Sequence, residues 1–213
     1  MRQVVKVSEP ESFLAWKGLR SAEWEPTYGI LQNPEKRDLH CALIREQGGT
    51  CCYCGREIDA ETSHIEHFRP QRQPYSHLAL SYENLFASCI RQTNPGSPRS
   101  CGHLKDDWFN EQLHISPSDP GCEEQFWYAL DGQVLPATPA ATEMVRVLGL
   151  DRGFLTSRRR EALAGVFDDD FLLSATRAEL GRLAIEFRTP GPDGELSAFF
   201  HVIARYAERL LAP

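Results

Sequence analysis

Two histidines and a glutamate lie within four consecutive positions, in the run His64-Ile65-Glu66-His67. Histidine has a pKa near neutrality, so it can take a proton from water at physiological pH. A carboxylate is a hard oxygen ligand of the kind that Mg²⁺ prefers. Hydrolysis of a phosphodiester needs both functions, a base for the attacking water and a cation beside the phosphate. The run therefore indicates metal-dependent hydrolysis, although each residue taken alone is more often an ordinary surface or hydrogen-bonded side chain.

Four of the seven cysteines have the spacing of a structural zinc site. Cys51 and Cys54 form a Cys-x2-Cys pair followed by a glycine, which lets two thiolates approach one tetrahedral Zn²⁺. Cys89 and Cys101 are the natural second pair. In a reducing compartment such a cluster favours metal ligation over disulfides, so we expect Zn²⁺ here, with buried packing or redox thiols as the alternative. The other three are expected to be core or surface residues: Cys41, Cys52 and Cys122.

The segment that carries these residues, 50–110, is rich in Cys, His, Pro and Asn and has only short apolar runs. A metal centre can replace a hydrophobic core in such a segment. If residues 64–67 are extended, His64 and Glu66 share one face and His67 points to the other. A bend at 68–70 would then bring His67 back towards the metal.

The flanking sequence predicts regular elements on both sides. A strand at 2–7, a helix capped by Ser8 and a helix opened by Asn33-Pro34 and ended by Gly48-Gly49 precede the cysteines. Strands are expected at 114–117 and 124–130, with a tight turn at Asp131-Gly132 leading into 133–135, and helices at 142–148, 155–175, 179–187 and 196–211.

The basic run 158–160 and the acidic run 168–170 would lie on one helix, as solvated stretches or as a docking patch. The whole pattern predicts an α+β fold in three parts. These are an N-terminal strand and helical segment (1–49), a zinc-stapled core (50–110), and a β-hairpin followed by a mostly helical extension (111–213).

The order of the motifs resembles the HNH endonuclease superfamily and, more closely, the HNH proteins of the Septu type, which also accompany some retrons. The matching motifs are Arg45-Glu46-Gln47, the knuckle at 51–55, the run at 64–70, Tyr82-Glu83-Asn84-Leu85, Ser88-Cys89, Cys101-Gly102-His103-Leu104-Lys105 and the later 148–151. The resemblance covers roughly residues 1–160 and is most specific from 46 to 105. It implies a zinc-stapled ββα-metal core that hydrolyses phosphodiester bonds.

The resemblance also implies the role of each site residue. Glu66 corresponds to the metal-binding carboxylate, His67 to the general base, and Asn84 to the residue that holds the base and the hairpin in position. His103 is the expected second ligand of a catalytic Mg²⁺, with Mn²⁺ as the alternative ion. Arg69 and Lys105 are expected to contact phosphate, and His64 is a supporting residue or an additional ligand.

Two departures from the family pattern concern the second metal ligand. Gly102 stands where many relatives have Asn or His, and the spacer between Cys89 and Cys101 is long. Since His103 lies two residues after Cys101, it is also a candidate for an extra zinc ligand.

The net charge of −7 argues against a free-standing, high-affinity nucleic-acid binder. The resemblance implies a DNA nuclease of an anti-phage defence system that acts with an ABC/SMC-like ATPase; RNA stays open as a substrate. The chain has no phosphate-loop motif, so that ATPase would be a separate subunit. A stand-alone restriction-type nuclease and a non-catalytic zinc-binding interaction module are the alternatives. With no apolar run of roughly 20 residues and no signal-peptide core, we expect a cytoplasmic protein without a membrane span.

Overall fold

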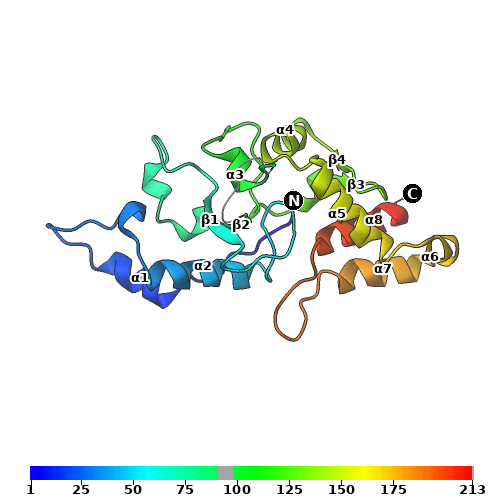
Figure 1. Ribbon diagram of the computed structural model, residues 1–213, viewed down its shortest axis with the longest axis horizontal. Coiled ribbons are helices and arrows are strands. Elements are labelled where there is room, and N and C mark those ends of the chain that lie inside the picture. Colours follow the sequence, from blue (N-terminus) through cyan, green and yellow to red (C-terminus); the bar gives the residue numbers. More distant parts are fainter. Residues whose placement is uncertain (91–97, 213) are drawn as a thin grey trace.

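The computed structural model describes residues 1–90 and 98–212 and has the expected α+β architecture. Within that part of the chain, helices surround two small antiparallel sheets of two strands each (Figure 1). The elements are α1 (Glu11–Gly18), α2 (Glu35–Glu46), β1 (Ser63–His67), β2 (Leu85–Cys89), α3 (Gly102–Lys105), β3 (Phe126–Tyr128), β4 (Val134–Pro136), α4 (Pro139–Leu148), α5 (Gly153–Ala164), α6 (Asp169–Ser174), α7 (Arg177–Glu186) and α8 (Phe200–Leu211).

The middle of the molecule is the hairpin of β1 and β2, followed in sequence by the short helix α3. Ser63 pairs with Cys89 at one end of the antiparallel ladder, and His67 pairs with Leu85 at the other. Every residue of β2 is buried, since α2 packs against the hairpin on one side and α3 contacts β2 as well. The hairpin thus supplies a rigid frame on which the His-Ile-Glu-His run and one of the cysteines are mounted.

The helix predicted after Asn33-Pro34 is present as α2. Pro34 is its N-cap and Gln47 its C-cap, while Leu39 and Leu43 form its buried stripe. The first helix begins later than predicted, at Glu11, because Pro10 and not Ser8 occupies the N-cap position of α1. Residues 2–7 form no strand, since this extended segment makes single contacts, such as Val4 N–H to the Pro117 carbonyl, in place of a ladder.

The second hairpin was predicted correctly in outline. Gly132, with φ of 86°, makes the turn that lets β3 pair with β4. The strand expected at 114–117 is absent, because the backbone N–H and ring of His114 both contact the Asn110 carbonyl in a turn.

The predicted long helix 155–175 is two helices. Helix α5 ends at Ala164, and the side chain of Asp168 accepts a hydrogen bond from Phe171 N–H and caps α6. The arginine and aspartate runs therefore lie on different helices. Arg159 is buried and donates to the carbonyls of Gly132 and Leu150 at 2.7 and 2.8 Å, so only its neighbours remain available at the surface.

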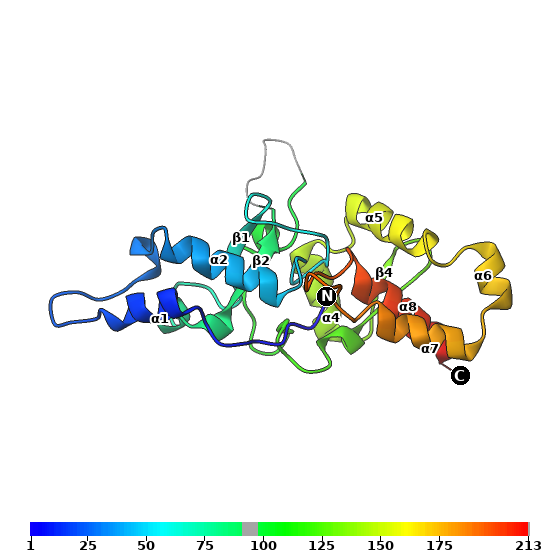
Figure 2. The same cartoon turned by 90° about the horizontal axis from the view of Figure 1, so that it is seen from below.

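One hydrophobic core joins the three predicted parts of the chain. It contains Leu43 from the first part, Phe86 from the second, and Leu148 and Ile203 from the third. Helix α8 begins at Phe200, four positions later than 196, and contacts α7, α5 and β3. Figure 2 shows α5 to α8 gathered at one end of the molecule and α1 and α2 at the other. None of the described helices has the length and apolar character needed to cross a bilayer.

Candidate functional site

The four predicted zinc ligands meet in the interior. The Sγ atoms of Cys51, Cys54, Cys89 and Cys101 all lie within 4.8 Å of one another, and all four residues are buried. Four thiolates at this spacing form the soft, tetrahedral donor set that Zn²⁺ prefers. The cluster is therefore suited to a structural metal, and the three cysteines expected to lie outside it do lie outside it.

Backbone contacts bring the two halves of this four-cysteine cluster together. Cys51 N–H donates to the Arg56 carbonyl and Gly55 N–H to the Cys51 carbonyl, which folds the knuckle into a tight loop. Gly55 has φ of 74°, a conformation that a side chain would disfavour. Cys89 ends β2, and its N–H donates to the Cys51 sulfur at 3.4 Å.

The thiols of the cluster resist losing their protons together. Burial would raise the pKa of Cys51, but hydrogen bonds from the other cysteines outweigh it and the pKa is lowered. The pKa of Cys101 is raised, first by its contact with Cys51. One thiolate thus forms readily and makes the next less favourable, a conflict that a bound cation removes.

A pocket of about 320 Å³ lies beside the cluster and contains most of the residues predicted to be catalytic. Strand β1 supplies His64, Glu66 and His67, and the start of α3 supplies Gly102 and His103. We call it the histidine pocket. His67 therefore lines the same pocket as His64 and Glu66, which the sequence placed on the other face of the strand.

Glu66 is buried and fully partnered at one of its oxygens. Its Oε1 accepts hydrogen bonds from Tyr53 Oη at 3.0 Å and Lys105 Nζ at 2.9 Å. Burial would raise the pKa of Glu66, but the charge of Lys105 and the contact with His64 lower it. The carboxylate is therefore held ionised in the interior.

Lys105 is turned inwards. Its side chain is 1% exposed, and besides Glu66 it donates to the His67 carbonyl at 3.0 Å. An ammonium in this position fixes the carboxylate and the end of β1 to α3. The phosphate contact expected from the sequence would require this buried side chain to reach solvent.

His64 presents its second nitrogen to the free oxygen of Glu66. Its Nδ1 lies 2.8 Å from the Ile90 carbonyl, which can only accept, so Nδ1 carries the proton. Its Nε2 lies 3.5 Å from Glu66 Oε2. Burial lowers the pKa of His64, but the hydrogen bond and charge of Glu66 outweigh it, and the pKa is raised.

His103 lies next to this pair. Its ring centroid is 4.4 Å from that of His64, and its Nε2 is buried without a hydrogen-bond partner in the described part of the chain. A buried imidazole nitrogen without a partner is uncommon and is a fitting metal donor. The candidate ligand atoms of the histidine pocket lie farther apart than those of the cysteine cluster. Among the described residues, the four cysteines form the only group of three or more ligand atoms that all lie within 4.8 Å of one another.

His67 is held in one tautomer. Its Nε2 lies 3.0 Å from the Ala79 carbonyl and must donate to it, so the lone pair of neutral His67 is on Nδ1. Nδ1 accepts a long hydrogen bond from Gln71 Nε2, at 3.4 Å. Burial lowers the pKa of His67, which keeps the ring neutral at physiological pH. A neutral imidazole in this tautomer can accept a proton at Nδ1.

Asn84 holds the loop that supplies the Ala79 carbonyl. Its side-chain oxygen accepts from Arg69 N–H at 2.8 Å, and its amide donates to the carbonyls of Arg69 and Leu78 at 3.0 and 3.3 Å. Its own carbonyl accepts from Phe68 N–H. Asn84 therefore closes the loop between β1 and β2 at its base, as a positioning residue.

Arg69 points away from the histidine pocket. Its guanidinium lies 5.1 Å from the centre of the Phe109 ring and 4.0 Å from Glu111.

Arg99, which the sequence did not single out, lines the histidine pocket and is exposed. Tyr53 and Ala79 were also missed. Tyr53 could have been noticed inside the cysteine knuckle, whereas nothing in the sequence marks a backbone carbonyl.

Neither a protein-family model nor a curated protein matches the chain.

Proposed function

We propose that the chain is a metal-dependent HNH endonuclease that hydrolyses phosphodiester bonds of DNA. The observation that carries the proposal is the 3.0 Å hydrogen bond from His67 Nε2 to the Ala79 carbonyl, which leaves Nδ1 as a base. The same pocket holds Glu66 and the unpartnered nitrogen of His103. The sequence β1, β2, α3 beside a four-cysteine cluster supports the ββα-metal interpretation.

The donors of the histidine pocket fit a divalent cation. Glu66 Oε2, His64 Nε2 and His103 Nε2 would hold it, since His103 Nε2 otherwise has no partner within the described residues. When bound, the cation would stabilise negative charge on the phosphate and on the leaving 3′-oxygen. Two imidazoles beside one carboxylate favour Mn²⁺ over Mg²⁺, which prefers oxygen ligands.

Proton transfer and the positioning of the site depend on the protein's own residues. His67 Nδ1 takes a proton from water, whose oxygen attacks phosphorus as the bond to the 3′-oxygen breaks; the leaving oxygen then takes a proton from solvent. Lys105 keeps Glu66 ionised, and the hydrogen bond from Tyr53 helps to fix its position. Asn84 holds the loop that orients the base.

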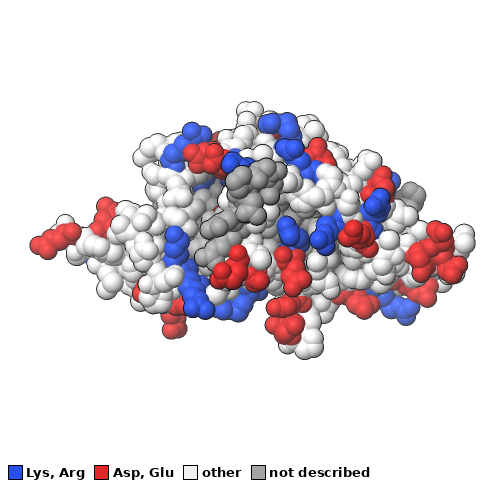
Figure 3. Space-filling view, viewed as in Figure 1, with Lys and Arg blue, Asp and Glu red and all other residues white. Residues whose placement is uncertain are grey.

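We further propose that the chain is the nuclease subunit of an anti-phage defence system and acts with a separate ATPase, as the resemblance to Septu-type proteins implies. Its net charge of −7 gives little attraction to nucleic acid. In Figure 3, acidic and basic side chains are mixed over the face shown. Leu173 and Ile185 of the helical extension are 87% and 71% exposed, which suits a partner-docking surface.

A plasmid-cleavage assay tests the function. Wild-type protein, with and without a candidate ATPase partner, is incubated with supercoiled plasmid and Mg²⁺ or Mn²⁺. We expect nicked and linear products that disappear with His67→Ala and persist with His77→Ala, an exposed control. Undiminished cleavage by His67→Ala in matched preparations, or no cleavage by the wild type with partner and either ion, would contradict the proposal.

A further inference from the structure

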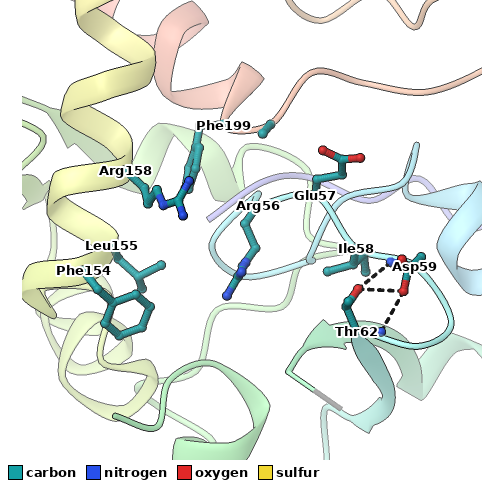
Figure 4. A pocket seen from close by; sticks show the side chains of 10 residues that line it. Arg56, Glu57, Ile58, Asp59, Thr62, Phe154, Leu155, Arg158 and Phe199 are labelled. Atoms are coloured by element: carbon teal, nitrogen blue, oxygen red, sulfur yellow. Dashed lines mark hydrogen bonds between the residues drawn. The ribbon is translucent and has the colours of Figure 1, made fainter. Parts of the chain in front are cut away.

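A second pocket, of about 510 Å³, lies where the knuckle segment meets the helical extension (Figure 4). It is lined by residues of three segments, those at 56–62, the start of α5 and residues 198–199 before α8. It shares no lining residue with the histidine pocket. Its volume is in the range of about 300–1,000 Å³ that is typical of small-molecule sites.

Two arginines extend into this pocket from different elements. Arg56 is half-buried and follows the knuckle, and Arg158 is exposed on α5 (Figure 4). Neither guanidinium has a hydrogen bond, ion pair or ring contact with any residue that the structure describes. Guanidinium groups stay charged and match phosphate oxygens in a bidentate geometry. The pair is therefore available to an anion.

The acidic residues of the pocket do not neutralise these charges. Asp59 Oδ1 is occupied by the backbone N–H groups of Glu61 and Thr62 and by the Thr62 hydroxyl, at 2.7 to 2.8 Å. The Glu57 carboxylate points away from Arg56 in Figure 4. Both carboxylates are thus directed elsewhere, and the side of the pocket that holds the guanidiniums is left positive.

The rest of the wall is mostly apolar and includes two aromatic rings. Phe154 is half-buried beside Leu155, and the buried residues Ile58 and Phe199 also line the pocket. Aromatic side chains of proteins that bind single strands stack on nucleobases, whatever the base. A ligand that fits both halves of the pocket carries a phosphate and a flat, weakly polar ring.

We propose that this arginine pocket, defined by Arg56, Arg158 and Phe154, binds a nucleotide, with the phosphate between the guanidiniums and the base against the phenyl ring. The nucleotide is either free or part of a single strand. The proposal does not rest on nuclease activity, because no residue of the histidine pocket takes part.

Binding is measured on the full-length, zinc-loaded protein carrying His67→Ala, without added divalent cation. The probes are AMP, by calorimetry, and fluorescein-labelled decathymidylate, by anisotropy. We expect Kd to rise on the order of tenfold or more with Arg56→Ala and with Arg158→Ala, because each removes charge-assisted hydrogen bonds. Phe154→Ala should weaken binding of whichever probe the parent protein binds. Binding of AMP identifies a free nucleotide as the ligand, and binding of the oligonucleotide alone identifies a strand.

Arg160→Ala is the matched control, since Arg160 is an exposed arginine on the same helix and does not line the pocket. Its Kd should stay at the value of the parent protein. Binding of neither probe at about millimolar concentration, or an equal loss in the Arg160 variant, would overturn the proposal. So would unchanged binding by Arg158→Ala, which is decisive even if the half-buried Arg56 variant fails to fold.

Discussion

Gly102 lies so close to Glu66 that a β-carbon at position 102 would overlap the Oε2 atom of the carboxylate. The same β-carbon would lie 2.7 Å from His64 Nε2. The absence of a side chain thus lets the start of α3 face the two donors directly. In the sequence this glycine was only a departure from the HNH pattern, but in the structure a larger residue could not be accommodated without moving Glu66.

Gly102→Ala should therefore reduce cleavage strongly while the protein still folds. The added methyl group displaces the Glu66 carboxylate, and we expect a loss on the order of a hundredfold, as for misplacement of a catalytic group by about 1 Å. Gly181→Ala is the control, because Gly181 lies within α7 with no atom near its missing side chain. Cleavage rate, zinc content and circular dichroism are measured together. Wild-type cleavage by Gly102→Ala would exclude Glu66 from the active site.

Cys54→Ser should abolish stoichiometric zinc binding. It removes one of four thiolates from a buried cluster whose metal would stabilise the fold. Cys41→Ser is the matched control, because Cys41 is only half-buried and lies outside the cluster. Metal content by mass spectrometry and the melting temperature are the measurements. Unchanged zinc content in Cys54→Ser would remove this cysteine from the ligand set.

Lys105→Met should destabilise the protein by about 3–5 kcal/mol, because the buried Glu66 carboxylate would lose its ammonium partner. Adding Glu66→Gln should recover much of this loss, since both charges are then gone. Urea unfolding of the two single variants and the double variant measures the coupling. If Lys105 served only to contact phosphate, Lys105→Met would instead leave stability within about 0.5 kcal/mol.

Local spacing was enough to predict the parts of the site that depend on short motifs. The knuckle and the His-Ile-Glu-His run could be recognised from their spacing, and the second cysteine pair from the need of a zinc site for two more ligands. Boundaries that depend on capping were less predictable. The helix from 155 breaks after Ala164 because Asp168 caps a new helix, a local competition that apolar periodicity does not reveal.

Relationships between distant segments could not be predicted. The inward direction of Lys105 depends on the packing of α3 on β2, and the Ala79 carbonyl that fixes His67 comes from an irregular loop. The arginine pocket likewise joins residues a hundred positions apart, Arg56 and Arg158. Such juxtapositions arise from tertiary packing, which no single segment encodes.

His201 should make stability depend on pH. It is 1% exposed, and burial, together with the N-terminal amine and nearby arginines, lowers its pKa well below 6.5. The unfolded chain takes up a proton near pH 6.5 while the folded protein does not, so stability falls as pH drops below that value. Between about pH 7.5 and 5.5 this contributes a loss of about 1.4 kcal/mol. Urea unfolding at both pH values should show that His201→Leu lacks this contribution while the exposed His77→Leu retains it; equal losses in the wild type and His201→Leu would contradict the argument.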